Sequence, residues 1–242
     1  MSRHADTLYA EPRDEVTPFA FDAAVTAVFE DMINRSVPGY QTVLGMLGVF
    51  ARRYVQPGSR VYDLGCSLGA ATLVMQRALT GVDCRLVAVD NAPAMVAACR
   101  NHCAGCVRPP VEVRCADIRD VAVEDASLVV LNLTLQFVPP AERTPLLRRL
   151  HAGLRPGGVL VLVEKVVHDD PAEQAFRAEL HHRFKKANGY SDLEISQKRA
   201  ALEEVLVPET VAAHERRLRD CGFQRVHKWF SCLNFAGLLA LR

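Results

Sequence analysis

Between residues 60 and 165, short apolar segments alternate with longer segments. In the longer segments, apolar residues recur every three or four positions. The short segments contain few polar positions, which is typical of strands that are buried on both faces of a parallel sheet. They predict strands at 60–65, 85–90, 111–117, 127–133 and 159–165. The longer segments predict helices at 71–79, 92–102 and 141–154. This alternation predicts an α/β protein with a mostly parallel sheet and helices on both faces.

Two more helices are predicted before this region. They cover residues 21–37 and 42–54, and the Pro38-Gly39 pair separates them. Residues 1–20 lack helical spacing, and we expect them to form a loose arm. Residues 1–54 are therefore predicted to form an N-terminal arm and lid helices.

A charged helical insertion is predicted after the fifth strand. Residues 171–206 have helical character, and Ser191 and Glu194 have the spacing of a capping box that begins a helix at 192–206. The whole insertion covers residues 166–206, and a lid or a dimer surface would lie there.

The last part of the chain completes the predicted sheet. A helix is expected from near Pro208 to Cys221-Gly222. The two segments that follow it, RVHKWFSC and LNFAGLLALR, predict a terminal strand pair. The prediction is therefore a seven-stranded, mostly parallel sheet within a main domain at 55–242.

The composition excludes some classes of protein. The 29 Lys and Arg residues are balanced by 28 Asp and Glu residues, whereas a surface that holds a long nucleic acid normally has a basic excess. No apolar run approaches the roughly 20 residues that span a bilayer. The first fifteen residues are too polar and acidic for a signal or transit peptide. We therefore expect a cytoplasmic protein with reduced cysteines, without direct contact to nucleic acid or membrane.

Polar side chains follow four of the predicted strands at the point where each strand ends. The segment 63–70, DLGCSLGA, joins the first strand to a helix, and Asp90, Asp117 and Asn132 end the next three strands. The carboxyl ends of parallel strands meet at one edge of a sheet, where ligands bind. A carboxylate at Asp90 can accept both hydroxyls of a ribose. Asp117 can accept an adenine amino group, and Ile118 can pack on the ring.

Two nucleotide ligands suit this arrangement. A dinucleotide requires G-x-G-x-x-G/A, but Ser67 replaces the second glycine, where a pyrophosphate would approach the backbone. S-adenosyl-L-methionine (SAM) has no phosphate, and the carboxylate of Asp63 could orient its amino group. The alternative without a ligand is a tight strand–helix turn at Gly65 and Gly69. The coincidence of the four strand ends favours SAM.

The ensemble resembles the class I SAM-dependent methyltransferase fold, which is Rossmann-like, over residues 55–242. A narrower resemblance, to the carboxy-S-adenosyl-L-methionine synthases, extends over nearly the whole chain. It rests on SVPGY (36–40), VYDLGCSLGAAT (61–72), VDNAPAM (89–95), VVLNLTLQF (129–137) and FKKANGYSDLEISQKR (184–199). The last segment is the most specific, because ordinary methyltransferases have no reason to share it.

This resemblance implies an activity and a set of ligand-binding residues. The family converts SAM and prephenate to carboxy-SAM and phenylpyruvate, without a metal, and is homodimeric. A separate transferase then moves the carboxymethyl group to the wobble uridine of tRNA. The family positions that this chain matches are Tyr40, Gly65, Cys66, Ser67, Asp90, Asn91, Asp117, Ile118, Asn132 and Arg199. Arg199 is expected to recognise the product carboxylate, although its helical spacing also suits a surface ion pair with Glu203.

The implied chemistry agrees with the residues. The sulfonium of SAM acidifies its methyl group, and the resulting sulfonium ylide can capture CO₂ released from prephenate. A carboxylate of prephenate can accept the methyl proton, and the strand ends show no nucleophile–base pair and no Asn-Pro-Pro-Tyr motif. Two alternatives remain: a methyltransferase acting on a small molecule or tRNA, and a SAM-binding regulator without catalysis.

Two further clusters are less informative. Cys99, Cys103 and Cys106 have a spacing similar to a zinc knuckle, with His102 and Cys115 nearby, but the first two lie at i, i+4 on a predicted helix and are expected to pack against the sheet. No metal is therefore predicted. The basic residues of the insertion, His181-His182 and Lys185-Lys186, suggest a solvated helix face. They could also steer prephenate or contact a second subunit.

Overall fold

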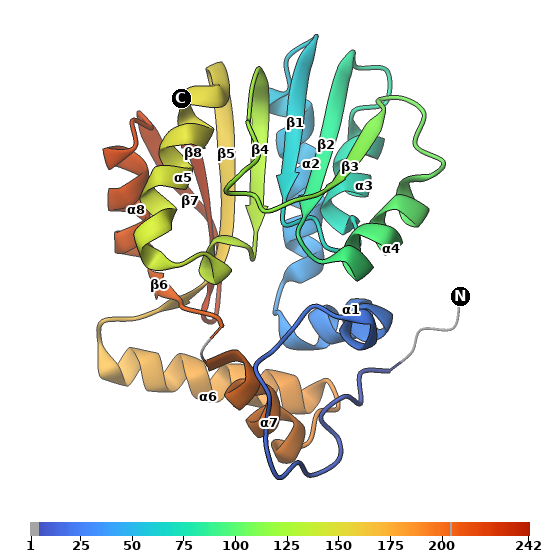
Figure 1. The fold of residues 1–242 in the computed structure, drawn as a ribbon. Helices are drawn as coiled ribbons and strands as arrows, with labels where there is room; N and C mark the ends of the chain where they lie inside the picture. The colour runs from blue at the N-terminus through green and yellow to red at the C-terminus, as the bar shows by residue number, and fades with distance from the viewer. Residues whose placement is uncertain (1–4, 204) are drawn as a thin grey trace.

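The computed structural model describes residues 5–203 and 205–242 and contains the predicted sheet (Figure 1). Its strand order is β3-β2-β1-β4-β5-β8-β7, in which the first five strands are parallel and β8 runs antiparallel between β5 and β7. The strands are β1 Ser59–Leu64, β2 Cys84–Asp90, β3 Val111–Cys115, β4 Ala126–Asn132, β5 Leu154–Val167, β7 Arg225–Cys232 and β8 Phe235–Leu241. The prediction of seven strands in a mostly parallel sheet is confirmed. A two-residue strand, β6 Glu209–Thr210, also pairs with the end of β5.

Helices cover both faces of the sheet, as predicted. They are α2 Tyr40–Tyr54, α3 Ala70–Ala78, α4 Pro93–Cys103, α5 Pro140–Gly153 and α8 Val211–Asp220. Side chains alternate along β1, so that Val61 packs on the α2–α3 face, whereas Tyr62 and Leu64 pack on the α5–α8 face. This alternation produces two apolar cores, one on each side of the sheet. None of the helices within the described residues is both long and apolar enough to cross a bilayer.

Three helices lie beyond the carboxyl ends of the parallel strands (Figure 1). They are α1 Ala23–Ser36, α6 Pro171–Ala187 and α7 Asp192–Glu203. The capping box that begins α7 is confirmed. The backbone N–H of Ser191 donates to the Glu194 carboxylate at 2.8 Å, and the Ser191 hydroxyl accepts the N–H of Glu194 at 3.2 Å.

The expectation of a loose N-terminal arm is wrong for residues 5–20, and residues 1–4 lie outside the described part of the chain. The Gln197 side chain of α7 donates to the carbonyls of Tyr9 and Glu11, both at 2.9 Å, and accepts the N–H of Arg13 at 2.8 Å. Asp6 is 1% exposed. Hydrogen bonds from Gln197 and the buried side chains of Tyr9 and Phe19 hold the arm against α7 without a helix, which is why no helical spacing marks it in the sequence.

The first residues of α8 and β5 also differ from the prediction. The last helix, α8, begins at Val211 rather than near Pro208, because residues 209–210 first pair with β5, and the Thr210 hydroxyl caps the helix. Strand β5 begins at Leu154 rather than 159. Leu154 pairs with Ala126, and a register shift follows before regular pairing begins at Leu128 and Val159.

Candidate active site

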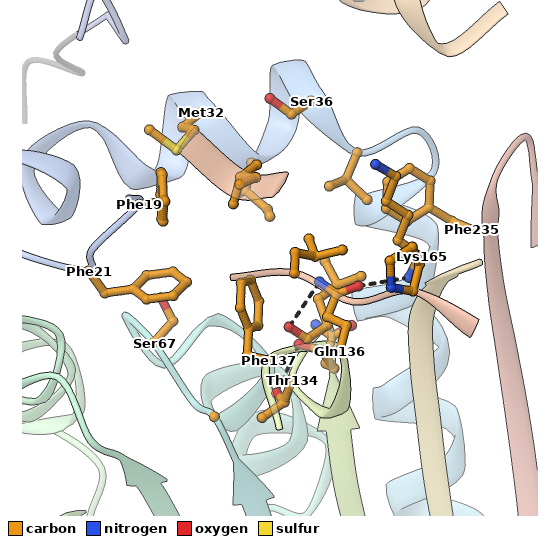
Figure 2. A pocket seen from close by; sticks show the side chains of 18 of the residues that line it. Phe19, Phe21, Met32, Ser36, Ser67, Thr134, Gln136, Phe137, Lys165 and Phe235 are labelled. Carbon is orange, nitrogen blue, oxygen red and sulfur yellow. Dashed lines mark hydrogen bonds between the residues drawn. The ribbon is translucent and has the colours of Figure 1, made fainter. Parts of the chain in front are cut away.

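A cavity of about 600 Å³ lies between the carboxyl ends of the parallel strands and the helices α1, α6 and α7. Figure 2 shows part of its wall. The cavity brings together all ten residues that the sequence singled out, namely Tyr40, Gly65, Cys66, Ser67, Asp90, Asn91, Asp117, Ile118, Asn132 and Arg199. This proximity is consistent with one ligand site, and their roles remain predictions.

The turn after β1 requires glycine. Gly65 has a φ of +84°, and a Cβ atom there would overlap the side chain of Thr134. The same applies at Gly69, which has a φ of +86° and where a Cβ would lie 2.8 Å from the Cys99 sulfur. Ser67 is also left-handed, with a φ of 49°. The backbone therefore makes a close turn, and Gly65, Cys66 and Ser67 of this turn line the cavity.

Asp90 holds this turn in place. One carboxylate oxygen accepts the N–H of Ser67 at 2.8 Å, and the other accepts the N–H of Ala92 at 3.0 Å. Burial raises the pKa of Asp90, and these backbone donors oppose the rise. Because each oxygen has a second lone pair, the carboxylate can still accept ligand hydroxyls.

Asp117 has a partner that the sequence analysis did not identify. The Arg119 guanidinium donates to both of its carboxylate oxygens, at 2.9 and 2.7 Å, and holds the pKa of Asp117 below its usual value. The pair fixes the orientation of the carboxylate at the cavity wall. The neighbouring Ile118 is 8% exposed and packs in the core.

Two buried oxygens at the ends of β1 and β4 have no hydrogen-bond partner within the described residues. They are Oδ1 of Asp63 and Oδ1 of Asn132. Oδ2 of Asp63 accepts the Thr72 hydroxyl at 2.5 Å, and burial raises the pKa of this carboxyl to about 6. Buried polar atoms are rarely left unpaired, so two acceptors in one cavity wall suit a donor group such as the ammonium of SAM. These residues therefore fit SAM.

Tyr40 and Cys66 border the same part of the cavity. Tyr40 begins α2 directly after Gly39, and burial together with the nearby Asp63 carboxylate raises the pKa of its hydroxyl. The Cys66 thiol points to the buried Cys99, and the two sulfur atoms are 3.9 Å apart. Cys99 and Cys103 pack on Ala88 of the sheet, which confirms that they are small core residues. The described residues contain no cluster of three or more His, Cys, Asp or Glu side chains suited to a metal ion.

The opposite ends of the cavity differ in character. Phe21 makes edge-to-face contacts with Phe19 and Phe137, at centroid distances of 5.1 and 5.4 Å, and forms an aromatic end. Lys165 lies near Phe235 at the other end (Figure 2). Lys185 and Arg199 also line the cavity, and each repels Lys165 electrostatically. We call Lys165, Lys185 and Arg199 the cationic end.

His181 separates the cationic end from α1. Its Nε2 lies 2.8 Å from the carbonyl of Ser36 and must donate, because a carbonyl only accepts. Its Nδ1 then accepts from the Asn234 amide at 3.2 Å. Burial lowers the pKa of His181 to about 3, so the imidazole is neutral and both its nitrogens are occupied.

The comparisons with known proteins agree with this geometry. A family model described as "Methyltransferase domain" matches residues 61–158. Curated relatives named carboxy-S-adenosyl-L-methionine synthase are 54% identical in Geobacter sp. (strain M21) and 51% identical in Shewanella oneidensis, and 100% of each chain is covered. The chain belongs to the carboxy-S-adenosyl-L-methionine synthase family. It is therefore an enzyme of that family.

Solved structures confirm the fold of this carboxy-SAM synthase family member. Human N-acetylserotonin methyltransferase in complex with SAM has a TM-score of 0.61 at 15% identity, covering 91% of this chain and 55% of that chain. An O-methyltransferase from Nostoc punctiforme has a TM-score of 0.64 at 13% identity, covering 91% and 59%. The predicted class I methyltransferase fold is thus confirmed.

Proposed function

We propose that this enzyme converts SAM and prephenate to carboxy-SAM and phenylpyruvate. The observation that carries the proposal is that a cavity suited to SAM is also lined by Arg199, whose guanidinium has no hydrogen bond or ion pair within the described residues. No ion pair joins it to Glu203 in the described structure, and Arg199 is an exposed residue of α7 that borders the cavity, so its guanidinium is free to bind a ligand. Methyl transfer needs no such cation, whereas a new carboxylate beside the sulfonium does.

The proposed binding of SAM uses the residues of the strand ends. Asp90 accepts the ribose hydroxyls, and Asp117 and Ile118 contact the adenine. Asp63 and Asn132 accept hydrogen bonds from the methionine ammonium through the two oxygens that otherwise lack partners. Gly65, Cys66 and Ser67 line the turn beside the sulfonium, and Tyr40 and Asn91 complete the wall.

The proposed reaction balances without a protein base. The carbon–carbon bond between the prephenate ring and its carboxylate breaks, and its electrons make the ring aromatic and expel the ring hydroxyl. The methyl group of SAM loses a proton, and its carbon forms a bond to the released CO₂. The proton and hydroxide leave together as water, and a prephenate carboxylate can carry the proton. His181 is a poor alternative base, because it is a hydrogen-bond donor at Nε2 and is already bonded at Nδ1.

Incubation of the purified protein with SAM, with and without prephenate, tests this function. We expect mass spectrometry to detect a nucleoside heavier than SAM by the mass of CO₂, and only when prephenate is present. Unmodified SAM in both samples would contradict the proposal. A methylated small molecule or tRNA formed without prephenate would support the methyltransferase alternative, and bound SAM without any turnover would support a regulatory protein.

We further propose that the enzyme is a cytoplasmic homodimer whose product is used by a separate tRNA carboxymethyltransferase. The family resemblance supports this role. The formal net charge of +1 argues against a long RNA-binding surface on this chain. Sedimentation equilibrium of the purified protein at micromolar concentration tests the dimer, and a single monomeric species would contradict it.

A further inference from the structure

Lys165, Lys185 and Arg199 reach the cavity from three different elements. They belong to β5, α6 and α7, which are far apart in the sequence. Neither ammonium group nor the guanidinium has a hydrogen bond or ion pair within the described residues. The electrostatic effects on Lys185 all come from cations, namely Lys165, Lys198 and Arg199.

Other cations of the same helices have carboxylate partners. Lys186 of α6 contacts Asp192 at 2.7 Å, and Arg183 of α6 contacts Glu179 at 2.7 Å. Lys198 of α7 contacts Asp6 at 3.5 Å. Unpaired ammonium groups in a largely buried position are costly, and the cost is reduced when an anion binds between them. The arrangement at the cationic end is therefore suited to an anionic ligand.

The cavity is also electrostatically polarised. Its carboxylates, Asp63, Asp90 and Asp117, lie at the ends of the first three strands, where SAM would present its ammonium, hydroxyl and amino donors. The cations lie at the β5, α6 and α7 side. Phe235 and the neutral ring of His181 meet edge to face there, at a centroid distance of 5.3 Å, and provide an apolar surface. A ligand with two carboxylates and a flat carbon ring matches this end.

We propose that Lys165 and Lys185 bind the carboxylate that the co-substrate retains, while Arg199 binds the carboxylate that is transferred. This inference rests on the proposed function and assigns the co-substrate site. Arg199 would contact the same carboxylate before and after transfer, first on the ring and then on the sulfonium product. Lys165 and Lys185 would contact the 2-oxo acid group of prephenate, which leaves unchanged in phenylpyruvate.

The variants Lys165→Met and Lys185→Met test the assignment, and Lys186→Met is the matched control because it lies on the exposed side of α6. We expect the KM for prephenate to rise by about tenfold to a hundredfold in the first two variants, with an unchanged Kd for SAM. The control keeps the wild-type KM. Thermal unfolding of each variant and the variant Lys185→Arg, which restores a cation, separate lost binding from a folding defect. An unchanged KM in both folded variants would overturn the inference.

A binding measurement distinguishes this inference from the proposed function. Calorimetry of prephenate with the S-adenosylhomocysteine complex, which has no methyl group to carboxylate, reports binding without turnover. We expect wild type and Lys186→Met to bind prephenate, and Lys165→Met and Lys185→Met to lose most of the affinity. That result supports the site even if the wild-type enzyme forms no carboxy-SAM. Equal binding by all four proteins overturns the site even if carboxy-SAM is formed.

Discussion

At the residue scale, Arg199 is the side chain that we propose distinguishes carboxylation from methyl transfer. Its guanidinium presents two parallel donors that match a carboxylate, and it has no partner in the described structure. We expect Arg199→Ala to keep SAM binding and to lose most carboxy-SAM formation. A charge-assisted hydrogen bond of about 1.5–3 kcal/mol corresponds to a tenfold or larger loss. Product yield by mass spectrometry and SAM affinity by calorimetry measure both effects.

A suitable control for this variant is Arg183→Ala, which removes an exposed arginine of α6 that is paired with Glu179. It should retain the wild-type yield. Unchanged carboxy-SAM formation in Arg199→Ala would exclude a role for this guanidinium in recognising the product.

The proposed role of Lys185 predicts a pH dependence of prephenate binding. Burial, together with the charges of Lys165, Lys198 and Arg199, lowers the pKa of Lys185 to about 7, while the adjacent His181 is neutral. The ammonium form binds an anion, so affinity should be greatest below pH 7. The KM for prephenate should then rise as the pH increases above 7, by at most about tenfold per pH unit for one proton. Steady-state kinetics from pH 6 to 9 measure this, at saturating SAM.

The variant Lys185→Arg provides the control for this profile. A guanidinium remains charged over the whole range, so the rise in KM near pH 7 should disappear or move to higher pH. The same rise in both proteins would assign the titration to another group.

At the scale of elements, one buried carboxylate holds the loop that follows β4. The oxygens of Glu164 in β5 accept the backbone N–H groups of Thr134, Leu135 and Gln136 at 3.2, 2.8 and 3.0 Å. Replacement by leucine, in Glu164→Leu, leaves three buried donors without an acceptor. We expect the free energy of unfolding to fall by at least about 3 kcal/mol, and SAM to bind more weakly because Thr134 and Asn132 line the cavity.

Urea unfolding and SAM titration measure these two losses. Glu124→Leu is the control, because the Glu124 side chain is 69% exposed. A wild-type unfolding midpoint in Glu164→Leu would show that the loop does not depend on this carboxylate.

The N-terminal arm connects the helices that cover the cavity. The buried Asp6 carboxylate accepts the Tyr190 hydroxyl and lies 3.5 Å from the ammonium of Lys198, which also contacts the Ser36 hydroxyl at 3.2 Å. The backbone N–H of Asp6 donates to the Asp31 carboxylate of α1 at 2.7 Å. The arm, α1 and α7 therefore meet at one buried ion pair, adjacent in sequence to Arg199.

The variant Asp6→Asn breaks that ion pair and should destabilise the protein by about 3 kcal/mol, because it leaves a buried ammonium without a carboxylate. We also expect faster cleavage of the arm in limited proteolysis, since the arm is anchored there. The exposed Asp14 of the same arm provides the control variant, Asp14→Asn. Equal stability and equal cleavage of both variants would mean that the arm is held elsewhere.

At the scale of the whole molecule, the sequence was sufficient for the sheet and for the SAM side of the cavity. Each polar residue follows its apolar strand within a few positions in the sequence. Asp90, Asp117 and Asn132 could therefore be placed at the carboxyl edge of the sheet from the predicted topology alone. The cationic end could not be located in this way. Lys165 lies near the end of β5, directly after Glu164, and the sequence does not reveal that α6 and α7 lie on the other side of the cavity that it lines.

The basic residues of α6 illustrate the limit. The sequence suggested one solvated face, but the pair His181 and Lys185, four positions apart, lines the cavity. In the other pair, only His182 borders the cavity, and Lys186 and the Nε2 of His182 both contact Asp192 at 2.7 Å. Helical spacing predicts that the two pairs point in different directions. It does not predict which pair faces inward, because that depends on the helix against which α6 packs.

The amino-acid sequence alone determined the element order, the parallel sheet, the glycine turn after the first strand and the strand-end residues Asp90, Asp117 and Asn132, which line one cavity. These features depend on local periodicity and on strand direction, which neighbouring residues encode. The tertiary structure decided that the arm is packed, that Asp117 is paired with Arg119, and that three cations from distant elements share one end of the cavity. The contacts of the arm join residues almost two hundred positions apart, and the three cations come from elements tens of positions apart. Arg119 is only two positions from Asp117, but its ion pair depends on a side-chain orientation that the sequence pattern does not specify.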